Sequence, residues 1–256
     1  STLMRSSAAS DVYKRQKVTN SGLPVVVLAQ SGGGTVEWAE AGINVREKDA
    51  DWVETDKMTV YKADGSTDVE ETACGIRLRG NSTQEFPKKP FAIKLASKAK
   101  VLGMPKHKRW VLLANWMDRT MLRNAVAFEV AHQTENAFAD GIGWNPHGYN
   151  VEVIMDGRHV GNYYLCEQIK IDGDRVNIQD CYEDVLEENP NPTVADCGYL
   201  LEFDDNYDEV NKFHTGRGLP CMFKDIVSDE LFDAVKARIE GIEANLEAGN
   251  LSLIHI

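Results

Sequence analysis

The sequence predicts an α+β fold in which a strand-rich front half precedes much of the helical content. Three observations support this. Short apolar or alternating runs are separated by Asp-Gly turns, which is typical of β-hairpins. Two segments carry apolar residues at helical spacing, and no internal repeat is present. With 256 residues, of which 43% are hydrophobic, the chain is long enough to bury a substantial core.

The strands of the front half are apolar or alternating runs bounded by turn residues. An Asp-Gly turn at Asp64 and Gly65 ends the second run, and a polar, basic loop over 80–90 joins the third to the fourth. The expected strands are 23–30, 56–62, 72–79, 91–95 and 110–114.

The clearest helix is expected over 118–133, because Asp118 or Thr120 can cap it and an apolar stripe follows. We expect that stripe to face inward. Its members are Leu122, Ala125, Val126, Glu129 and Val130, so the Glu129 carboxylate would lie on the inward face. Strands at 151–155 and 162–167 flank a second Asp-Gly turn. A strand at 198–204 then leads into an acidic loop, and an amphipathic helix covers 229–248.

Composition excludes some classes of protein. The formal net charge of −12 argues against a nucleic-acid partner, which usually requires a basic surface. No apolar stretch reaches the roughly 18 residues that a membrane-spanning helix needs. The five cysteines are well separated, without a C-x-x-C motif, and Cys166 is expected to be a small buried apolar side chain. Segments 1–16 and 251–256 lack a fold pattern and are expected to be non-native or disordered; no export signal is visible.

Lys94 is the first residue that suggests chemistry. Strand alternation places Phe91, Ile93 and Leu95 on one face and Lys94 on the other. Lys94 is then either a solvated lysine or the phosphate-binding lysine of a kinase-type strand. A carboxylate on the inward stripe of the helix needs a partner, so the sharper hypothesis pairs Glu129 with Lys94. In the alternative, Glu129 reaches water from the edge of the stripe.

The loop after the third strand is the second candidate site. Arg79, Gly80, Asn81 and Ser82 are followed by Lys88 and Lys89. Backbone amides, hydroxyls and positive charge in this combination can hold an anion such as a triphosphate. The other interpretation is a polar hairpin loop with solvated lysines. The chain contains no P-loop and no G-x-G-x-x-G motif.

Acidic residues after residue 200 are weak candidates for metal binding. Asp204, Asn206 and Asp208 match the first ligands of a calcium loop, but the match fails further on, where glycine and a bidentate glutamate are required. Glu202 and Asp204 therefore remain as weak candidate ligands of a divalent ion. A glycosidase carboxylate pair at these two positions is disfavoured, because few aromatic residues surround them.

Taken in order, four segments resemble the CotH (spore coat protein H) kinase family. They are RLRGNSTQEFPKKPFAIKL (77–95), LGMPKHKRWVLLANWMDRTMLRNAVAFEVA (102–131), VEVIMDGRHVGNYYLCEQIKIDGDRVNI (151–178) and GYLLEFDDNYDE (198–209). The resemblance covers essentially everything from about 23 to 246. The combination in this order is specific, whereas each segment alone is a weak signal.

The resemblance implies a bacterial atypical protein kinase that uses ATP with Mg²⁺ or another divalent metal to phosphorylate serine in a protein substrate. It implies a kinase-like N-terminal lobe over 17–178, and a strand, acidic loop and helix leading into the C-terminal lobe over 179–250. It favours an extracytoplasmic or spore- or cell-surface location. The implied nucleotide-binding residues are Arg79, Gly80, Asn81, Ser82, Lys88, Lys89, Lys94, Glu129 and Glu167. The implied site-supporting residues are Asp118, Arg123 and Asn124.

The chain also departs from the family pattern. The family's presumed catalytic aspartate and its metal-binding acids belong to segments that follow the last expected helix, so no catalytic residue is assigned and these groups are expected downstream of Glu247. The resulting hypothesis is an incomplete nucleotide-binding fragment of a kinase, inactive by itself, because phosphoryl transfer depends on positioning and charge neutralisation. The alternative is a non-catalytic extracytoplasmic scaffold or adhesion module with the same fold.

Overall fold

The computed structural model describes residues 21–30, 52–134, 143–182, 186–187 and 193–249. The terminal segments 1–16 and 251–256 lie outside these residues. The chain divides into two compact units. The first contains residues up to 137 together with 145–169, and the second contains 138–144 together with the residues from 170 onward.

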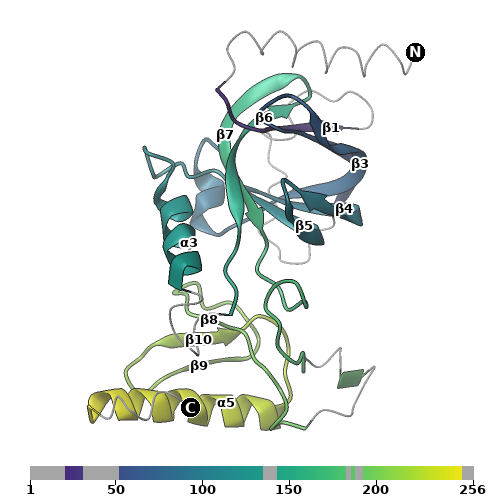
Figure 1. The fold of residues 1–256 in the computed structure, drawn as a ribbon. Helices are drawn as coiled ribbons and strands as arrows, with labels where there is room; N and C mark the ends of the chain where they lie inside the picture. The colour runs from purple at the N-terminus through teal and green to yellow at the C-terminus, as the bar shows by residue number, and fades with distance from the viewer. Residues whose placement is uncertain (1–20, 31–51, 135–142, 183–185, 188–192, 250–256) are drawn as a thin grey trace. The chain divides into compact units, whose positions relative to one another are not determined.

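The first unit is a closed barrel of seven strands (Figure 1). The strands are β1 Val25–Gln30, β2 Val53–Tyr61, β3 Thr67–Leu78, β4 Phe91–Val101, β5 Met104–Leu113, β6 Gly148–Met155 and β7 Arg158–Glu167. Their order around the barrel is β1-β2-β3-β4-β5-β7-β6. All neighbours are antiparallel except β1 and β6, which pair in parallel and close the barrel.

Both predicted Asp-Gly turns are present. Asp64 accepts hydrogen bonds from the backbone N–H and the hydroxyl of Ser66 at the β2–β3 turn. At the β6–β7 turn Asp156 and Gly157 both have positive φ, which is the conformation that Asp-Gly favours in a two-residue hairpin. A third hairpin joins β4 to β5, and it makes both strands longer than the sequence predicts, because the polar stretch after Leu95 continues the pairing.

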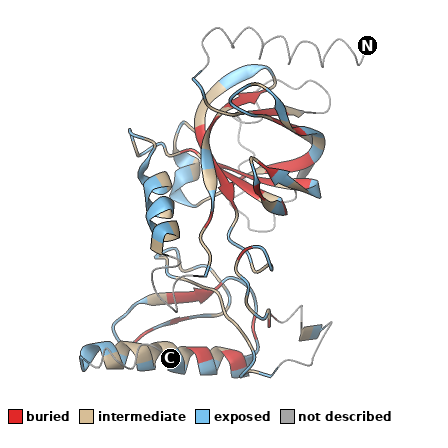
Figure 2. Cartoon of the chain, viewed as in Figure 1, coloured by how far each residue is buried: buried red, intermediate tan, exposed pale blue. Residues whose placement is uncertain are grey.

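The barrel interior contains the alternate residues of each strand. In β4, Phe91, Ile93 and Leu95 are buried in the main apolar cluster, as the sequence predicts. Trp110 of β5 is completely buried and donates its indole N–H to the backbone oxygen of His107, 3.1 Å away. Figure 2 shows buried stretches in red along the strands of the barrel.

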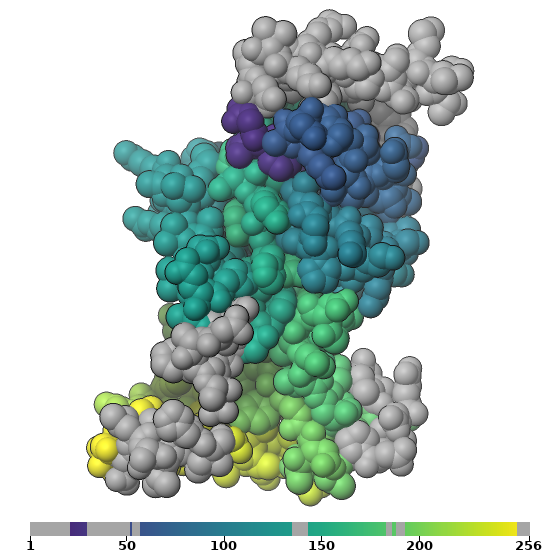
Figure 3. Space-filling model, viewed as in Figure 1, coloured from purple at the N-terminus to yellow at the C-terminus, as the bar shows by residue number. Residues whose placement is uncertain are grey.

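The helix α3 (Arg123–Thr134) packs on the outside of the barrel, and of the predicted stripe it is Ala125 that takes part in this packing. Ala125 and Phe128 contact a small cluster of Val111, Tyr164 and Cys166, and the Phe128 and Tyr164 rings lie 5.9 Å apart. The exposed side chains include three that the sequence placed inward: Leu122 (50% exposed), Val126 and Val130 (56% each). The prediction of their burial is wrong, because the large Phe128 side chain determines which face meets the barrel. The space-filling view shows this segment at the molecular surface (Figure 3).

The second unit is a small three-stranded sheet covered by a long helix. Its strands are β8 Leu201–Glu202, β9 Lys212–His214 and β10 Pro220–Phe223, in the order β8-β10-β9. The helix α5 (Asp229–Glu247) is capped by the Ser228 hydroxyl, which accepts a hydrogen bond from the Leu231 N–H. Leu231 and Val235 of α5 pack on Phe213 and Phe223 of the sheet. The predicted strand at 198–204 is confirmed only over two residues.

A disulfide joins Cys181 to Cys197 in the second unit, which the sequence reasoning did not predict. Cys181 belongs to the buried cluster of this unit, and the bond closes a loop with a sequence separation of 16 residues. Cys166 is buried, as predicted. The predicted α+β class is confirmed. No helix in the described part of the chain is long and apolar enough to cross a membrane.

Candidate functional site

A cavity of about 310 Å³ opens where β3 and β5 end and where β4 and α3 begin. Five of the residues that the sequence singles out line it: Arg79, Lys88, Asp118, Arg123 and Asn124. Three of the five are cations, although the chain as a whole is strongly acidic. The remaining lining residues are Thr83, Phe86, Pro90, Leu113, Ala114, Asn115, Trp116 and Met117.

Lys88 is held inside this cavity by the barrel. Its ammonium group donates to the backbone oxygen of Ala114, 2.7 Å away, and to the backbone oxygen of Asn162, and it lies 4.4 Å from the centre of the Tyr163 ring. Burial lowers the pKa of Lys88, and the charge of Glu152 partly opposes this shift. An ammonium group has three N–H donors, so two backbone oxygens leave one donor for a ligand in the cavity.

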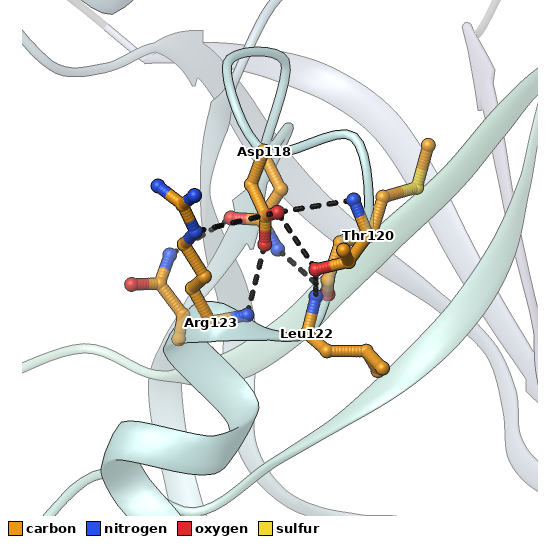
Figure 4. A network of polar contacts seen from close by, with 7 residues as sticks. Asp118, Thr120, Leu122 and Arg123 are labelled. Carbon is orange, nitrogen blue, oxygen red and sulfur yellow. Dashed lines mark hydrogen bonds and ion pairs between the residues drawn. The ribbon is translucent and has the colours of Figure 1, made fainter.

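Asp118 organises the turn that precedes α3 (Figure 4). Its carboxylate accepts hydrogen bonds from the Arg123 N–H at 2.8 Å, from the Thr120 hydroxyl at 2.7 Å and from the Thr120 N–H at 3.0 Å. The Arg123 side chain also lies 3.7 Å from this carboxylate. Both predicted capping residues are used, because the Thr120 hydroxyl accepts from the Leu122 N–H. The helix therefore begins at Arg123, five residues later than the sequence predicts.

The pKa of Asp118 is lowered to about 2, first by the Arg123 backbone N–H and then by the Thr120 hydroxyl. A folded-state pKa below the ordinary value of 3.8 stabilises the fold above about pH 4, and this stabilisation is lost as the pH falls towards 2. We therefore expect the stability difference between the wild type and Asp118→Asn to shrink over this interval. Urea unfolding midpoints at several pH values measure it. Asp205→Asn, which changes an exposed aspartate, serves as the control; an equal pH dependence of both variants would contradict the assignment.

Asn115 and Asn124 connect the end of β5 to the start of α3. The Asn124 side-chain amide donates to the Asn115 side-chain oxygen at 2.8 Å, and the Asn115 amide donates to the Met121 backbone oxygen at 3.4 Å. Asn115 has a positive φ of 50°, a conformation that asparagine tolerates better than most residues. Sequence reasoning missed Asn115 and Trp116 as lining residues. The available signal was an asparagine directly after a buried strand.

The other predicted site residues of the basic loop, Gly80, Asn81, Ser82 and Lys89, do not line the cavity. The Gly80 backbone oxygen accepts from the Gln84 side chain, and the Asn81 backbone oxygen accepts from the Gln84 N–H. Ser82 begins the short 3₁₀ helix η2 (Ser82–Glu85). Lys89 donates to the Gln84 backbone oxygen, 2.6 Å away. Of the two candidate lysines in this loop, the structure therefore places Lys88, and not Lys89, at the cavity.

Lys94 and Glu129 do not form the predicted ion pair. Glu129 is exposed on α3 and accepts a hydrogen bond from the Gln133 side chain at 3.0 Å. Lys94 lies on the outer face of β4, opposite Arg109 of β5. The structure agrees with the alternative, in which Glu129 reaches water, because Glu129 lies on an exposed face of α3. Neither residue lines the cavity.

Glu167 lies at the end of β7, and its side chain is completely buried. It accepts hydrogen bonds from the backbone N–H of His147 at 3.0 Å and from the His147 Nδ1 atom at 3.1 Å. The His147 ring in turn stacks on His132 of α3, with ring centres 4.0 Å apart. Glu167 thus holds His147, the residue directly before β6, beside His132 of α3, and it is absent from the cavity lining.

The candidate metal ligands are engaged by the protein itself. Glu202 accepts from the Lys224 ammonium group, which also lies 3.3 Å from Glu209. The Asp204 carboxylate accepts from the Asn206 N–H at 2.9 Å. The described residues contain no group of three or more His, Cys, Asp or Glu side chains that could hold a metal ion. The described donor set therefore does not fit a resident metal.

Together these observations define an α+β chain whose barrel carries a cation-lined cavity. The family model described as CotH kinase protein matches residues 76–248. Because this match covers more than half of the chain, the protein belongs to the CotH kinase family, as the sequence motifs indicate. No curated protein matches the chain significantly.

Proposed function

We propose that this protein binds the phosphates of a nucleoside triphosphate, ATP by family resemblance, in the cavity lined by Lys88. One observation carries the proposal: residues from separate segments, Arg79, Lys88 and Arg123, bring three cations to one cavity of an acidic chain. A triphosphate supplies several anionic oxygens, and charge-assisted hydrogen bonds to Arg and Lys are the strong ones.

The environment of Lys88 supports an anionic ligand. Burial lowers the pKa of this lysine, so its ammonium form lacks part of the stabilisation that water provides. A nearby phosphate oxygen would restore that stabilisation and would accept the third N–H donor. Asp118 and Asn115 hold Arg123 and Asn124 at the cavity before any ligand arrives. The apolar lining side chains, Phe86, Leu113, Trp116 and Met117, suit the base of a nucleotide.

We extend this proposal to a kinase that transfers the phosphoryl group to serine in a protein substrate. Family membership supports this assignment. ATP would act with Mg²⁺ or another divalent ion, which phosphoryl-transfer enzymes use to neutralise charge. The described residues supply no group of three or more side chains that could hold this ion.

The test is titration calorimetry of ATP and of tripolyphosphate, each at constant ionic strength. Arg123→Gln is expected to weaken both ligands by roughly tenfold or more, because a charge-assisted hydrogen bond to phosphate is lost. Lys106→Gln removes the same charge from an exposed position on β5 and is expected to leave both affinities unchanged. The proposal fails if the wild type binds neither ligand, or if Arg123→Gln binds both as the wild type does.

A further inference from the structure

A second cavity, of about 570 Å³, lies in the second unit between the β9–β10 turn and the C-terminal half of α5. Most of the side chains that line it are apolar, and we refer to it as the α5 groove. All of its lining residues belong to the second unit, so it is distinct from the cavity that Lys88 lines. Its apolar lining residues are Phe203, Leu219, Pro220, Ile239, Ile242 and Leu246.

The apolar lining of the groove is partly open to solvent. Leu219 is 44% exposed, Leu246 49% and Phe203 54%. None of these three side chains belongs to the buried cluster that packs α5 on the sheet. On the helix side, Ile239, Ile242 and Leu246 recur at intervals of three and four residues, so they form an apolar ridge about 10 Å long. Open apolar side chains gathered in one groove indicate an interaction site, whereas scattered single ones do not.

Polar contacts hold the two walls of the groove together. The Thr215 hydroxyl donates to the Glu243 carboxylate at 2.6 Å, and the Arg217 backbone N–H donates to the same carboxylate at 3.3 Å. The Arg217 side chain also lies 3.4 Å from the Glu247 carboxylate. Because Glu243 and Glu247 belong to α5, these contacts attach the β9–β10 turn to the helix. Walls that are ordered before a ligand arrives lower the entropic cost of binding.

The part of the chain that contains the groove is strongly acidic. Residues 170–249 include 20 Asp and Glu side chains but only 7 Lys and Arg, so the excess of negative charge in the chain, which is −12 in total, lies in this part. Among the described residues that line the groove, Arg217 is the only cation, and Glu247 lies beside it. A positively charged partner would therefore meet apolar walls within a negative electrostatic field.

We propose that the α5 groove binds a basic amphipathic helix of a partner protein. Such a helix places apolar residues at i, i+3 or i+4 and i+7 into a hydrophobic groove, a spacing that matches the apolar ridge of α5. Lysine and arginine at the edges of the bound helix would face the acidic surface, which favours fast and oriented association. The same negative charge disfavours an anionic membrane surface as the occupant. The inference does not depend on the proposed nucleotide binding.

The experiment measures the fluorescence anisotropy of a labelled helical peptide, with leucine on one face and lysine and alanine elsewhere, as the full chain is added at constant ionic strength. Phe203→Ala and Leu246→Ala are each expected to weaken binding by about tenfold, because each removes an apolar side chain from the groove. Val210→Ala and Ile226→Ala remove exposed apolar side chains outside the groove and are expected to bind the peptide as the wild type does. A peptide with glutamate in place of lysine is expected to bind about tenfold more weakly, or less.

Weaker binding in the two groove variants, with full binding in both controls and weak binding of the glutamate peptide, supports the proposal. If Leu246→Ala unfolds at a lower temperature than the wild type, Phe203→Ala keeps the test valid, because Phe203 lies outside the buried cluster of the second unit. The proposal is wrong if the wild type does not bind the lysine peptide, if all four variants bind it alike, or if the glutamate peptide binds as tightly. It is also wrong if sedimentation shows a wild-type dimer that Leu246→Ala converts to a monomer, because a second copy of the chain then occupies the groove.

Discussion

Replacing Trp110 with alanine is expected to lower the free energy of unfolding of the barrel by about 3–5 kcal/mol. Trp110 is completely buried and is the largest side chain of the barrel core. Its removal leaves a cavity between strands that cannot collapse, because the barrel is closed by pairing on both sides of every strand. The indole hydrogen bond to His107 is lost as well. Urea unfolding followed by near-ultraviolet circular dichroism measures the change.

Two further variants separate the contribution of burial from that of tryptophan itself. Trp116→Ala removes the same side chain from a position that is 48% exposed, and is expected to cost less than about 1 kcal/mol. Trp110→Phe keeps an aromatic ring in the core and is expected to fall between the two. If Trp110→Ala and Trp116→Ala shifted the unfolding midpoint equally, the barrel interior could not be the stabilising core described above.

The barrel strands were predictable because their signals are local. Alternating residues such as Phe91, Ile93 and Leu95 identify a half-buried strand, and the two Asp-Gly pairs locate two hairpins. Closure of the sheet was not predictable in this way. It depends on the parallel pairing of β1 with β6, whose residues are more than 100 positions apart in the chain, and no local pattern encodes such a contact.

The helix α3 shows why the candidate site was only partly predictable. Two sets of its residues have helical spacing: the predicted stripe of Leu122, Ala125, Val126, Glu129 and Val130 is one, and Ala125 with Phe128, three positions later, is the other. Periodicity alone cannot decide between them, and the barrel selects the stripe that contains Phe128. The pairing of Glu129 with Lys94 depended on the wrong choice.

Residues of the cavity were predicted more reliably, because they belong to short motifs and not to a face of a helix. Arg79 and Lys88 come from the basic loop, and Asp118, Arg123 and Asn124 come from the turn before α3 and the first two residues of this helix. Capping chemistry makes Asp118 recognisable in sequence, since its role needs only residues within five positions of it. Asn115 contributes through a contact with Asn124, nine positions away, and such a contact has no sequence signature.

Removal of the disulfide is the second large effect that we expect. The Cys181–Cys197 bond closes a loop with a separation of 16 residues, and the chain-entropy model assigns such a loop about 3 kcal/mol of stabilisation. The double variant Cys181→Ala and Cys197→Ala is therefore expected to lower the free energy of unfolding of the second unit by about this amount. Urea unfolding of the wild type and the variant, each with and without reductant, measures it.

Urea unfolding of the wild type and of the double variant, each with and without reductant, also provides the control. Reductant is expected to bring the wild type close to the double variant and to leave the variant unchanged, since its remaining cysteines, Cys74, Cys166 and Cys221, form no disulfide in the structure. Alkylation of the unfolded wild type without reductant should label these three thiols, and after reduction all five cysteines. Labelling of five cysteines without reductant would contradict the bond. Because disulfides persist mainly in oxidising compartments, a confirmed bond would agree with the extracytoplasmic location that the family resemblance favours.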